Sequence, residues 1–424
     1  MKKRVVITGL GVVSPNGMGV EAFANALKKG VSGIRHSHTL EELQFSCQVA
    51  GKPIISVTTK EEYLTRLQLR GFNSTGILYG VIAGIDACKD AGLEINSETV
   101  DWDLSVIFGA GTSGIDKFRE AIYKVDEKNV RRLGSSVAIQ VMNSGVSAYL
   151  SGMIGAGGQV TTNSSACTTG TESILMGYDL IQSGRSKRVL VGSTSDSGPY
   201  IWGGFDAMKV CAYKYNDQPE KASRPMSESA NGFVPGSGAG ALLIESLESA
   251  EERGATIYAE ILGGHVNCGA QRNGGSLTAP NNEAVQRCIQ NALKQAGILA
   301  SDISTINGHL TATKKDPIEI KNWKEALGFT SSNFPPINSL KSMVGHGLSA
   351  SGALECVASV LQLKEQFIFP NINCEDPHPD ILTEIDQTAI PTKMIEKELN
   401  IIAKASFGFG DVNGCLIFKR YNTI

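Results

Sequence analysis

Residues 163–170 read NSSACTTG, and the position of Cys167 in this stretch is the most informative feature of the chain. The β-prone segment 159–162 precedes it. After it, an apolar stripe within 171–184 has the spacing of a helix, and the apolar strand 188–192 follows. The pattern predicts a β-α-β unit in which Cys167 lies at the turn from strand to helix.

Two interpretations of Cys167 follow from this position. The start of a helix favours negative charge, which lowers the pKa of a thiol toward that of a reactive thiolate. Small neighbouring residues also leave room for a substrate to approach. A free cysteine is, however, more often a buried structural residue. Position alone leaves the nucleophile and the structural thiol both open.

Length and composition indicate a large folded protein. The chain of 424 residues exceeds the size of one small hydrophobic core, so two domains or a duplicated fold are expected. Its 42% hydrophobic and 19% charged content excludes a disordered chain. The charged stretch 245–253 precedes a second α/β series, so we place the N-terminal half at 1–255 and the C-terminal half at 256–424.

Charge and cysteine usage exclude several classes of protein. A net charge of −3 offers no basic surplus for nucleic acid or an anionic membrane. The nine cysteines are scattered without CxxC spacing, which predicts reduced thiols in the cytoplasm rather than disulfides or a metal site. No apolar run is long enough to span a membrane. The apolar start, 4–11, is broken by glycines and predicts a first core strand, not a leader peptide.

Short strands that are apolar on both faces alternate with helical segments, which is typical of a sheet buried between helices. In the first half we expect strands at 104–108, 189–191 and 241–244, and helices at 21–29, 75–91 and 174–182. In the second half we expect a strand at 257–262, helices at 282–296 and 316–327, strands at 303–307 and 336–339, a long helix after Gly347, and strands at 401–405 and 415–419. A duplicated α/β unit fits this order, although the halves share too little sequence identity to show it.

Gly9 and Gly11 follow the first strand, as in a dinucleotide-binding loop. Ser14 stands where that fingerprint needs its third glycine, and no acidic residue ends a second strand at the right distance. Nucleotide binding is therefore not expected.

Two of the six histidines have unusual surroundings. His309 follows a buried strand and precedes hydroxyl side chains, so it faces a cleft beyond the strand ends, although such a residue alone is more often structural. His346 begins a helix of small residues, where the dipole holds an imidazole neutral and suited to donate a hydrogen bond. Lys341 and Glu355 bracket His346, and we expect them to pair beneath the histidines because buried charges need partners.

A glycine-rich segment, 405–414, joins the last two strands. As an ordinary hairpin loop it has no chemical role. Alternatively, its backbone N–H groups form a donor site covered by an aromatic side chain.

Taken together, Cys167, His309, His346, the Lys341 segment and the Phe409 loop resemble the β-ketoacyl-acyl-carrier-protein synthases of the KAS I/II type. These are condensing enzymes of the thiolase superfamily. The resemblance covers nearly the whole chain, including 4–11, 223–225, 232–234, 236–240 and 413–419. It implies an α/β, thiolase-like duplicated five-layered αβαβα fold, and it favours the nucleophile over the structural thiol.

The resemblance implies an acyltransferase, a 3-oxoacyl-[acyl-carrier-protein] synthase that performs a decarboxylative Claisen condensation of acyl and malonyl units. Cys167 would take the acyl group while the N–H groups of Cys167 and Phe409 hold the oxyanion. His309 and His346 would stabilise the enolate. The family match further implies orientation of the histidines by Lys341 and Glu355, pantetheine contacts from Thr311 and Thr313, a gate at Phe409, and a pocket lined by Thr112, Ser113 and Phe205.

The resemblance also implies partners. The substrates are carried on the phosphopantetheine of acyl carrier protein, and no metal or redox cofactor is required. The family is usually dimeric, so we expect a homodimer or a heterodimer with a subunit resembling a chain-length factor.

Three positions depart from the family pattern. Leu310 replaces the glycine after the first active-site histidine, Asp411 enters the glycine-rich loop, and Ser237 replaces an acidic residue. Leu310 and Asp411 are expected to add bulk and charge at the pantetheine tunnel and gate. This predicts a specialised synthase of a polyene, polyketide or pigment pathway. The alternative is a housekeeping fatty-acid elongation enzyme.

Related proteins with other functions fit less well. A catalytically inactive chain-length factor lacks the nucleophile that Cys167 provides. A degradative thiolase needs a further cysteine near the glycine-rich loop, and Cys415 lies too far along the last strand. A KAS III-like enzyme carries asparagine where His346 stands. A noncatalytic scaffold that binds acyl carrier protein is a further alternative. Such a protein would have the same fold but no thiolate, so a test for an acyl adduct would separate it from the enzyme.

Overall fold

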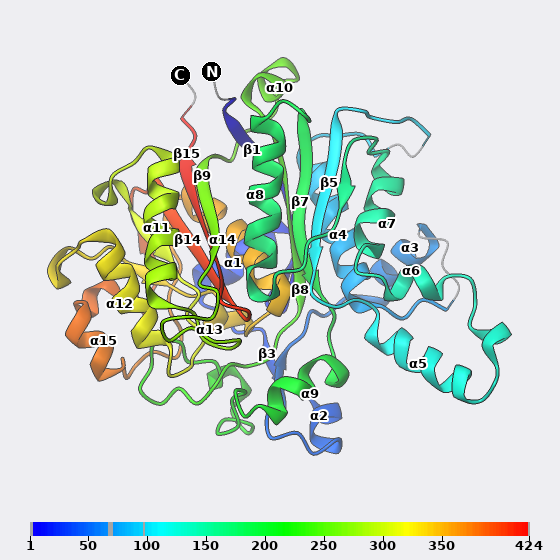
Figure 1. Ribbon diagram of the computed structural model, residues 1–424, viewed down its shortest axis with the longest axis horizontal. Coiled ribbons are helices and arrows are strands. Elements are labelled where there is room, and N and C mark those ends of the chain that lie inside the picture. The colour runs from blue at the N-terminus through cyan, green and yellow to red at the C-terminus, as the bar shows by residue number, and fades with distance from the viewer. Residues whose placement is uncertain (1–2, 67–70, 96–97, 423–424) are drawn as a thin grey trace.

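The computed structural model describes residues 3–66, 71–95 and 98–422, which form a mixed α/β fold around one large sheet (Figure 1). The sheet has 11 strands, and its main path runs β11-β10-β14-β15-β9-β1-β8-β7-β5-β6. The strands of the N-terminal half are β1 (Val5–Ser14), β5 (Leu104–Ala110), β6 (Val160–Thr161), β7 (Arg188–Ser195) and β8 (Gly238–Ser246). Those of the C-terminal half are β9 (Ala259–Cys268), β10 (Thr305–Asn307), β11 (Ile337–Asn338), β14 (Ile401–Gly408) and β15 (Val412–Arg420).

The two halves of the sheet have the same topology. The series β1-β8-β7-β5-β6 in the first half matches β9-β15-β14-β10-β11 in the second, strand for strand in chain order. The pairing directions correspond too, because the first two pairs of each series are antiparallel and the last two are parallel. The duplication is thus visible in the chain path. The predicted boundary after residue 255 lies between α10 (Leu247–Glu252) and β9.

Helices form three layers around the two half-sheets, which gives the five-layered αβαβα order. The outer face of the first half packs on α4 (Thr75–Asp90) and α7 (Gly145–Ile154). The outer face of the second packs on α11 (Asn282–Ala296), beside α12 (Asp316–Leu327). Between the halves lie α8 (Thr169–Gln182) and α14 (Ser351–Glu365), which contact each other and strands of both halves (Figure 1).

Alternation along the strands divides the apolar side chains among three cores. On β7, Val189 and Val191 join the central core around α8 and α14, whereas Leu190 joins the outer core around α4. On β14, Ile402 faces the central core and Ala403 faces the core around α11. Period-two alternation of buried residues therefore lets each half-sheet carry helices on both faces.

Shorter elements surround these layers. The remaining helices are α1 (Val20–Lys29), α2 (His38–Glu42), α3 (Val57–Arg66), α5 (Ile115–Asp126), α6 (Val137–Val141), α9 (Pro199–Ala207), α13 (Lys341–Val344) and α15 (Pro379–Glu384). The remaining strands are β2 (Gly17–Met18), β3 (Ile34–His36), β4 (Val49–Gly51), β12 (Phe367–Ile368) and β13 (Ile395–Glu396). Within the described part of the chain, no helix has the length and apolar character needed to cross a membrane.

Two glycines let the central helices approach closely. A Cβ on Gly170 of α8 would lie 2.3 Å from the backbone nitrogen of Ala353 on α14. A Cβ on Gly352 of α14 would lie 2.6 Å from the backbone nitrogen of Thr171 on α8. Each glycine is the second residue of its helix, so the two first turns meet backbone to backbone.

The sequence predictions of regular elements hold with a few shifts. Helices α11 and α12 have the predicted bounds, whereas the strand predicted at 303–307 shortens to β10. The strand predicted at 257–262 becomes the longer β9, because its far end pairs with β15. The helix predicted after Cys167 starts at Thr169, and a 3-10 turn at Ala166–Thr168 precedes it.

Gly9 and Gly11 have a packing role. Both lie within β1, which continues as a buried strand to Ser14. A Cβ on Gly11 would lie 1.8 Å from the carbonyl oxygen of Ala83, and one on Gly9 would lie 2.1 Å from that of Ala87, both on α4. The glycines therefore let α4 lie directly against the strand.

This packing predicts that Gly11→Ala lowers the thermal unfolding midpoint, because the backbone of α4 must move; overpacking of this kind costs about 1–3 kcal/mol. Gly152→Ala is the matched control. Gly152 is exposed within α7 and its Cβ would meet nothing within 4 Å, so alanine should leave the midpoint unchanged or raise it. Differential scanning calorimetry of both variants checks this, and a Gly11→Ala midpoint at or above that of the wild type would contradict the assignment.

Candidate active site

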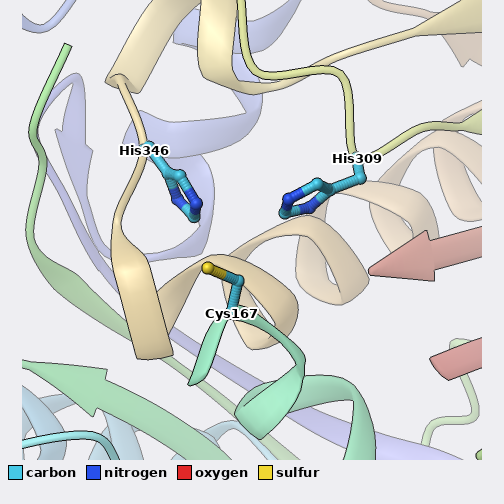
Figure 2. Close-up of side chains that lie close together, drawn as sticks. All are labelled: Cys167, His309 and His346. Carbon is cyan, nitrogen blue, oxygen red and sulfur yellow. The ribbon is translucent and has the colours of Figure 1, made fainter. Parts of the chain in front are cut away.

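Cys167, His309 and His346 come together from three separate segments of the chain (Figure 2). The thiol sulfur and one nitrogen from each ring lie within 4.8 Å of one another. The ring centroids of His309 and His346 are 5.4 Å apart, and the angle between the two ring planes is 83°. Figure 2 shows the two rings turned toward each other above the sulfur. The structure thus brings together the three side chains singled out from the sequence.

Cys167 lies in a strained but well-supported turn. Ala166 has a φ of 49°, a left-handed value that is unusual for alanine. The hydroxyl of Thr169 accepts a hydrogen bond from the N–H of Ser165 (2.9 Å) and donates one to the carbonyl of Ala166 (2.6 Å). The side-chain amide of Asn163 donates to the carbonyl of Thr169 (2.9 Å). These bonds fix the backbone on both sides of Cys167, so its sulfur lies just before the first turn of α8.

The thiol of the free protein is less acidic than expected. Burial raises the pKa of Cys167 to about 11, although Lys341 and the backbone N–H groups of Phe409 and of Cys167 itself act in the opposite direction. The prediction that the helix start lowers this pKa is therefore wrong, because desolvation of the thiolate outweighs the nearby N–H groups. Both N–H groups nevertheless point at the sulfur, as an oxyanion site requires.

His346 lies ahead of its helix rather than at its first turn. It follows α13, and a 3-10 turn at Leu348–Ala350 separates it from α14. The N–H of Leu348 donates to its Nδ1 (3.2 Å), and the hydroxyl of Ser351 lies 2.9 Å from the same atom. Because Nδ1 accepts, the neutral ring carries its proton on Nε2, which is then free to donate.

His309 has the same tautomer for a different reason. The ammonium of Lys341 donates to the carbonyl oxygen of His309 (2.7 Å) and lies 3.5 Å from its Nδ1. A protonated lysine is only a donor, so Nδ1 of His309 is the acceptor and its proton is on Nε2. Both histidines therefore offer an N–H donor.

Burial keeps both rings neutral. It lowers the pKa of each histidine well below its usual value, and the positive charges of Lys341 and Lys404 lower it further. The neutral state predicted for His346 thus follows from desolvation and neighbouring lysines rather than from a helix dipole.

The support beneath the histidines contains one predicted pair and one residue that the sequence analysis missed. Lys341 and Glu355 form a buried ion pair, as expected. The missed residue is Lys404 of β14, which is fully buried, and its Nζ lies 3.0 Å from the other carboxylate oxygen of Glu355. A signal for it existed, because a lysine inside the apolar strand 401–405 requires a buried partner.

Two further carboxylates hold the loop that carries His309. Glu319 accepts hydrogen bonds from the N–H groups of His309 (2.6 Å) and Leu310 (2.8 Å). Asp316 accepts from the N–H groups of Thr311 (2.9 Å) and Ala312 (3.0 Å). Burial and the charge of Asp316 raise the pKa of Glu319 to about 7. Acidic residues at 316 and 319, in the first turn of a helix, were the available signal for such anchoring.

Phe409 lies at the tip of the β14–β15 hairpin, and its backbone N–H contacts the thiol of Cys167. The role of this N–H as an oxyanion donor stays a prediction. A row of aromatic rings extends from Phe409. Phe205 of α9 is 6.0 Å from Phe409 and 5.6 Å from Phe233, and Phe233 is 5.2 Å from His346, between ring centroids. Phe205 therefore lies beside Phe409. The roles of Phe409 as a gate and of Phe205 as a pocket residue stay predictions.

The other predicted substrate contacts lie in two loops. The hydroxyls of Thr311 and Thr313 face each other at 3.1 Å, directly after His309. Ser113 is buried and donates to the carbonyl of Gln140 (3.4 Å), whereas Thr112 is exposed. The roles of these residues in binding stay predictions.

Two departures from the family pattern do not lie where the sequence suggested. Leu310 is fully buried in the core around α11, so it adds no bulk to an entrance. Asp411 is also fully buried, and its carboxylate accepts from the N–H groups of Gln271 (2.9 Å) and Asn281 (2.7 Å). It anchors the loop after β9 rather than placing a free charge at the gate. Ser237 is buried beside β8 and donates its N–H to the carbonyl of Gly51 (2.9 Å).

Two side-chain groups among the described residues have the spacing of metal ligands. One is Cys167 with His309 and His346, and the other is the partly exposed set of His36, His38 and Glu41 near α2. Thiol and imidazole ligands suit zinc and similar ions. In the first group, the Nε2 atoms carry protons that a metal ion would have to displace.

Comparisons with known proteins agree with this geometry. The model of the beta-ketoacyl synthase N-terminal domain matches residues 2–250, and that of the C-terminal domain matches 258–375. The 3-oxoacyl-[acyl-carrier-protein] synthase 2 of Vibrio harveyi is 34% identical over 423 residues, which covers 99% of both chains.

Two solved structures are similar over the whole chain. A ketosynthase in a complex with its type II polyketide acyl carrier protein is 28% identical with a TM-score of 0.87, covering 99% of this chain and 100% of the other. The ishigamide ketosynthase/chain length factor is 27% identical with a TM-score of 0.86, covering 100% of both. The chain therefore belongs to the beta-ketoacyl synthase family, and it is an acyltransferase of the 3-oxoacyl-[acyl-carrier-protein] synthase type.

Proposed function

We propose that Cys167, His309 and His346 carry out a decarboxylative Claisen condensation through an acyl-Cys167 intermediate. The observation that supports this most directly is the placement of one thiol beneath two neutral imidazoles that both present an Nε2–H donor. A nucleophile and two donors at one point suit a reaction that forms a thioester and then an enolate.

In the first step, the sulfur of Cys167 attacks the carbonyl carbon of an acyl thioester. The new S–C bond forms, the bond to the pantetheine sulfur breaks, and the thiol proton passes to the departing thiolate. The N–H groups of Cys167 and Phe409 hold the oxygen of the tetrahedral intermediate. Because the free thiol has a raised pKa, its deprotonation takes place with substrate bound rather than in advance.

In the second step, a malonyl thioester binds with its carbonyl oxygen between His309 and His346. Loss of CO2 leaves the bonding electrons on the two-carbon unit as an enolate, and the two Nε2–H donors stabilise its oxygen. The enolate carbon attacks the acyl carbonyl on Cys167 and the C–S bond breaks. Cys167 takes up a proton and the 3-oxoacyl product leaves. These steps draw on no metal or redox cofactor.

We further propose that the substrates arrive on the phosphopantetheine of acyl carrier protein in the cytoplasm, and that the chain forms a dimer. The type II polyketide neighbour, described as a complex with its acyl carrier protein, supports the first partner. Strand β6 ends the sheet, and the exposed Val100, Trp102 and Val160 surround this edge. An open apolar edge suits pairing with a second copy or with a chain-length-factor-like subunit.

For the acyl substrate, we propose a specialised polyene, polyketide or pigment-type chain. Support comes from two structural neighbours, a type II polyketide ketosynthase described as bound to a hexaketide and the ishigamide ketosynthase/chain length factor. Leu310 and Asp411 lend no support, since both side chains turn into the protein core. Housekeeping fatty-acid elongation is the second candidate, because curated relatives at 34% identity are named 3-oxoacyl-[acyl-carrier-protein] synthase 2, a name that mentions no specialised product.

The mechanism predicts a covalent adduct on Cys167. Wild-type protein incubated with an acyl carrier thioester should gain the mass of the acyl group on the peptide that contains Cys167, as seen by mass spectrometry. Cys167→Ala should gain none, whereas Cys268→Ala, which removes an exposed cysteine, should gain it as the wild type does. An adduct that persists in Cys167→Ala, or is missing from the wild type, would overturn the nucleophile assignment.

The raised pKa predicts slow alkylation of the free protein. With a thiol pKa of about 11, the thiolate fraction of Cys167 rises tenfold per pH unit across the neutral and mildly alkaline range. Its reaction with iodoacetamide should therefore accelerate about tenfold from pH 7 to 8 and again to pH 9. Peptide-resolved mass spectrometry measures this, with the exposed Cys268 as a marker of accessible reagent. A rate that is already constant above pH 7 would show a lowered pKa instead.

The substrate proposal predicts a preference among acyl carriers. Unsaturated or 3-oxo acyl chains should be elongated at least about tenfold faster than saturated medium chains, because about 1.4 kcal/mol of differential transition-state binding gives that ratio. Product analysis over a panel of acyl carriers decides between the two candidates. Equal rates with saturated chains would support housekeeping elongation.

A further inference from the structure

Lys404 is the least expected charge in the protein. It lies on β14, where every residue is buried, and it has no exposed surface. Its ammonium contacts three groups: the hydroxyl of Thr171 (2.8 Å), the hydroxyl of Ser406, and Glu355 at 3.0 Å in an ion-pair contact. A buried lysine with a specific carboxylate partner beside a reactive site is a candidate for a functional role.

The cluster around Lys404 carries more positive than negative charge. Lys341 and Lys404 are both 2% exposed or less, and they share the single carboxylate of Glu355, one lysine on each oxygen. The other titratable groups that face Lys404 are His309, His346, Cys356 and Cys415, whose pKa values it lowers. None of these supplies a second negative charge, because the cysteines are buried thiols with raised pKa values. Glu319, which accepts from the N–H of His309, also interacts with Lys341, but burial and the charge of Asp316 raise its pKa to about 7, so it offsets only part of the surplus at neutral pH.

The contacts of Lys404 reach all three parts of the site. Thr171 lies in the first turn of α8, the helix that begins beside Cys167. Ser406 precedes the hairpin tip that presents the N–H of Phe409. Glu355 of α14 forms an ion pair with Lys341, whose ammonium group lies beside Nδ1 of His309. Lys404 thus contacts elements of all three parts, but only the ion pairs through Glu355 and Lys341 connect it to a side chain of the reacting cluster, His309.

We propose that Lys404 is a positioning residue of the condensation. It holds Glu355 in the orientation that places Lys341 against His309, and its charge keeps both histidines neutral with the proton on Nε2. The same charge favours the enolate that forms at the histidines. This inference rests on the proposed function, because it assigns to Lys404 the second step and not the acylation of Cys167.

Two variants test the role. Lys404→Met removes the ammonium group and keeps an unbranched side chain that is one atom shorter. Lys404→Gln also removes the charge but keeps polar atoms that can bind the hydroxyls of Thr171 and Ser406. Both should still acylate Cys167 at a rate within about threefold of the wild type. The kcat of condensation should fall on the order of tenfold to a hundredfold with KM for the malonyl carrier little changed, as for a misplaced reacting group.

The pH profile separates positioning from a structural role. Without the charge of Lys404 the pKa values of His309 and His346 rise, so the acidic limb of condensation kcat should move about one unit to higher pH. Glu319, which accepts from the N–H of His309 and has a pKa of about 7, titrates on the same limb, and its contribution should be common to the wild type and the variants. Protonation at Nδ1 abolishes the acceptor that fixes each ring. Lys404→Arg, which keeps the charge, should retain the wild-type limb.

Lys117→Met is the matched control. Lys117 of α5 is also buried, but it binds the carbonyl of Gly71 and the carboxylate of Glu120, away from the site. Its loss should leave the acidic limb and the condensation kcat in place.

The outcomes are distinct. A wild-type limb and wild-type kcat in Lys404→Met, or in Lys404→Gln if the methionine variant does not fold, would overturn the role of Lys404. So would a loss of kcat with an unmoved limb. Failure of wild-type protein to acylate Cys167 would instead overturn the proposed function itself.

Discussion

The backbone contact between the first turns of α8 and α14 is the constraint on which the site depends. Gly170 and Gly352 each leave space for the other helix, and a side chain at either position would push the two turns apart. Cys167 directly precedes one turn, and Ser351, which meets Nδ1 of His346, begins the other. Separation of the helices would therefore move Cys167 away from His346. Close-packed interiors transmit such shifts because they have few voids to absorb them.

The duplication explains why these turns meet. Each half places a helix at the same point of the repeated strand series: α8 lies between β6 and β7, and α14 lies between β11 and β14. Each helix follows a 3-10 turn that begins with a non-glycine residue at positive φ. Those residues are Ala166 at 49° and Leu348 at 52°. The two repeats then diverge in chemistry. The first turn carries Cys167, whereas the second carries Ser349, whose hydroxyl donates to the carbonyl of Thr194 (2.7 Å). The same turn geometry thus carries the proposed nucleophile in one half and, in the other, leads into Ser351, whose hydroxyl lies 2.9 Å from Nδ1 of His346.

The sequence predicts what local patterns determine and misses what depends on tertiary contacts. Helix α11 was predictable to its ends because the side chain of Asn281 caps its start and Gly297 ends it in a left-handed conformation. The three side chains that cluster in the structure, Cys167, His309 and His346, were singled out from the sequence because each follows a predicted strand or precedes a predicted helix. Which way Leu310 and Asp411 point was not predictable, since both depend on partners far away in the chain. Glu319 and Lys404 were missed for the same reason: their partners are backbone or side-chain groups that come close only after folding.

A surplus of buried positive charge would be a poor choice for stability alone. Desolvation of a second lysine costs more than one shared carboxylate returns, so an apolar residue at 404 would pack at least as well. The proposed condensation changes this balance, because its second step forms an enolate between His309 and His346, and the surplus positive charge favours that anion. In the free protein Lys404 only shares the carboxylate of Glu355 with Lys341, and burial raises the pKa of Cys167 so that the thiol adds no further anion. A field that is unfavourable at rest and favourable in the transition state lowers the barrier rather than only tightening substrate binding.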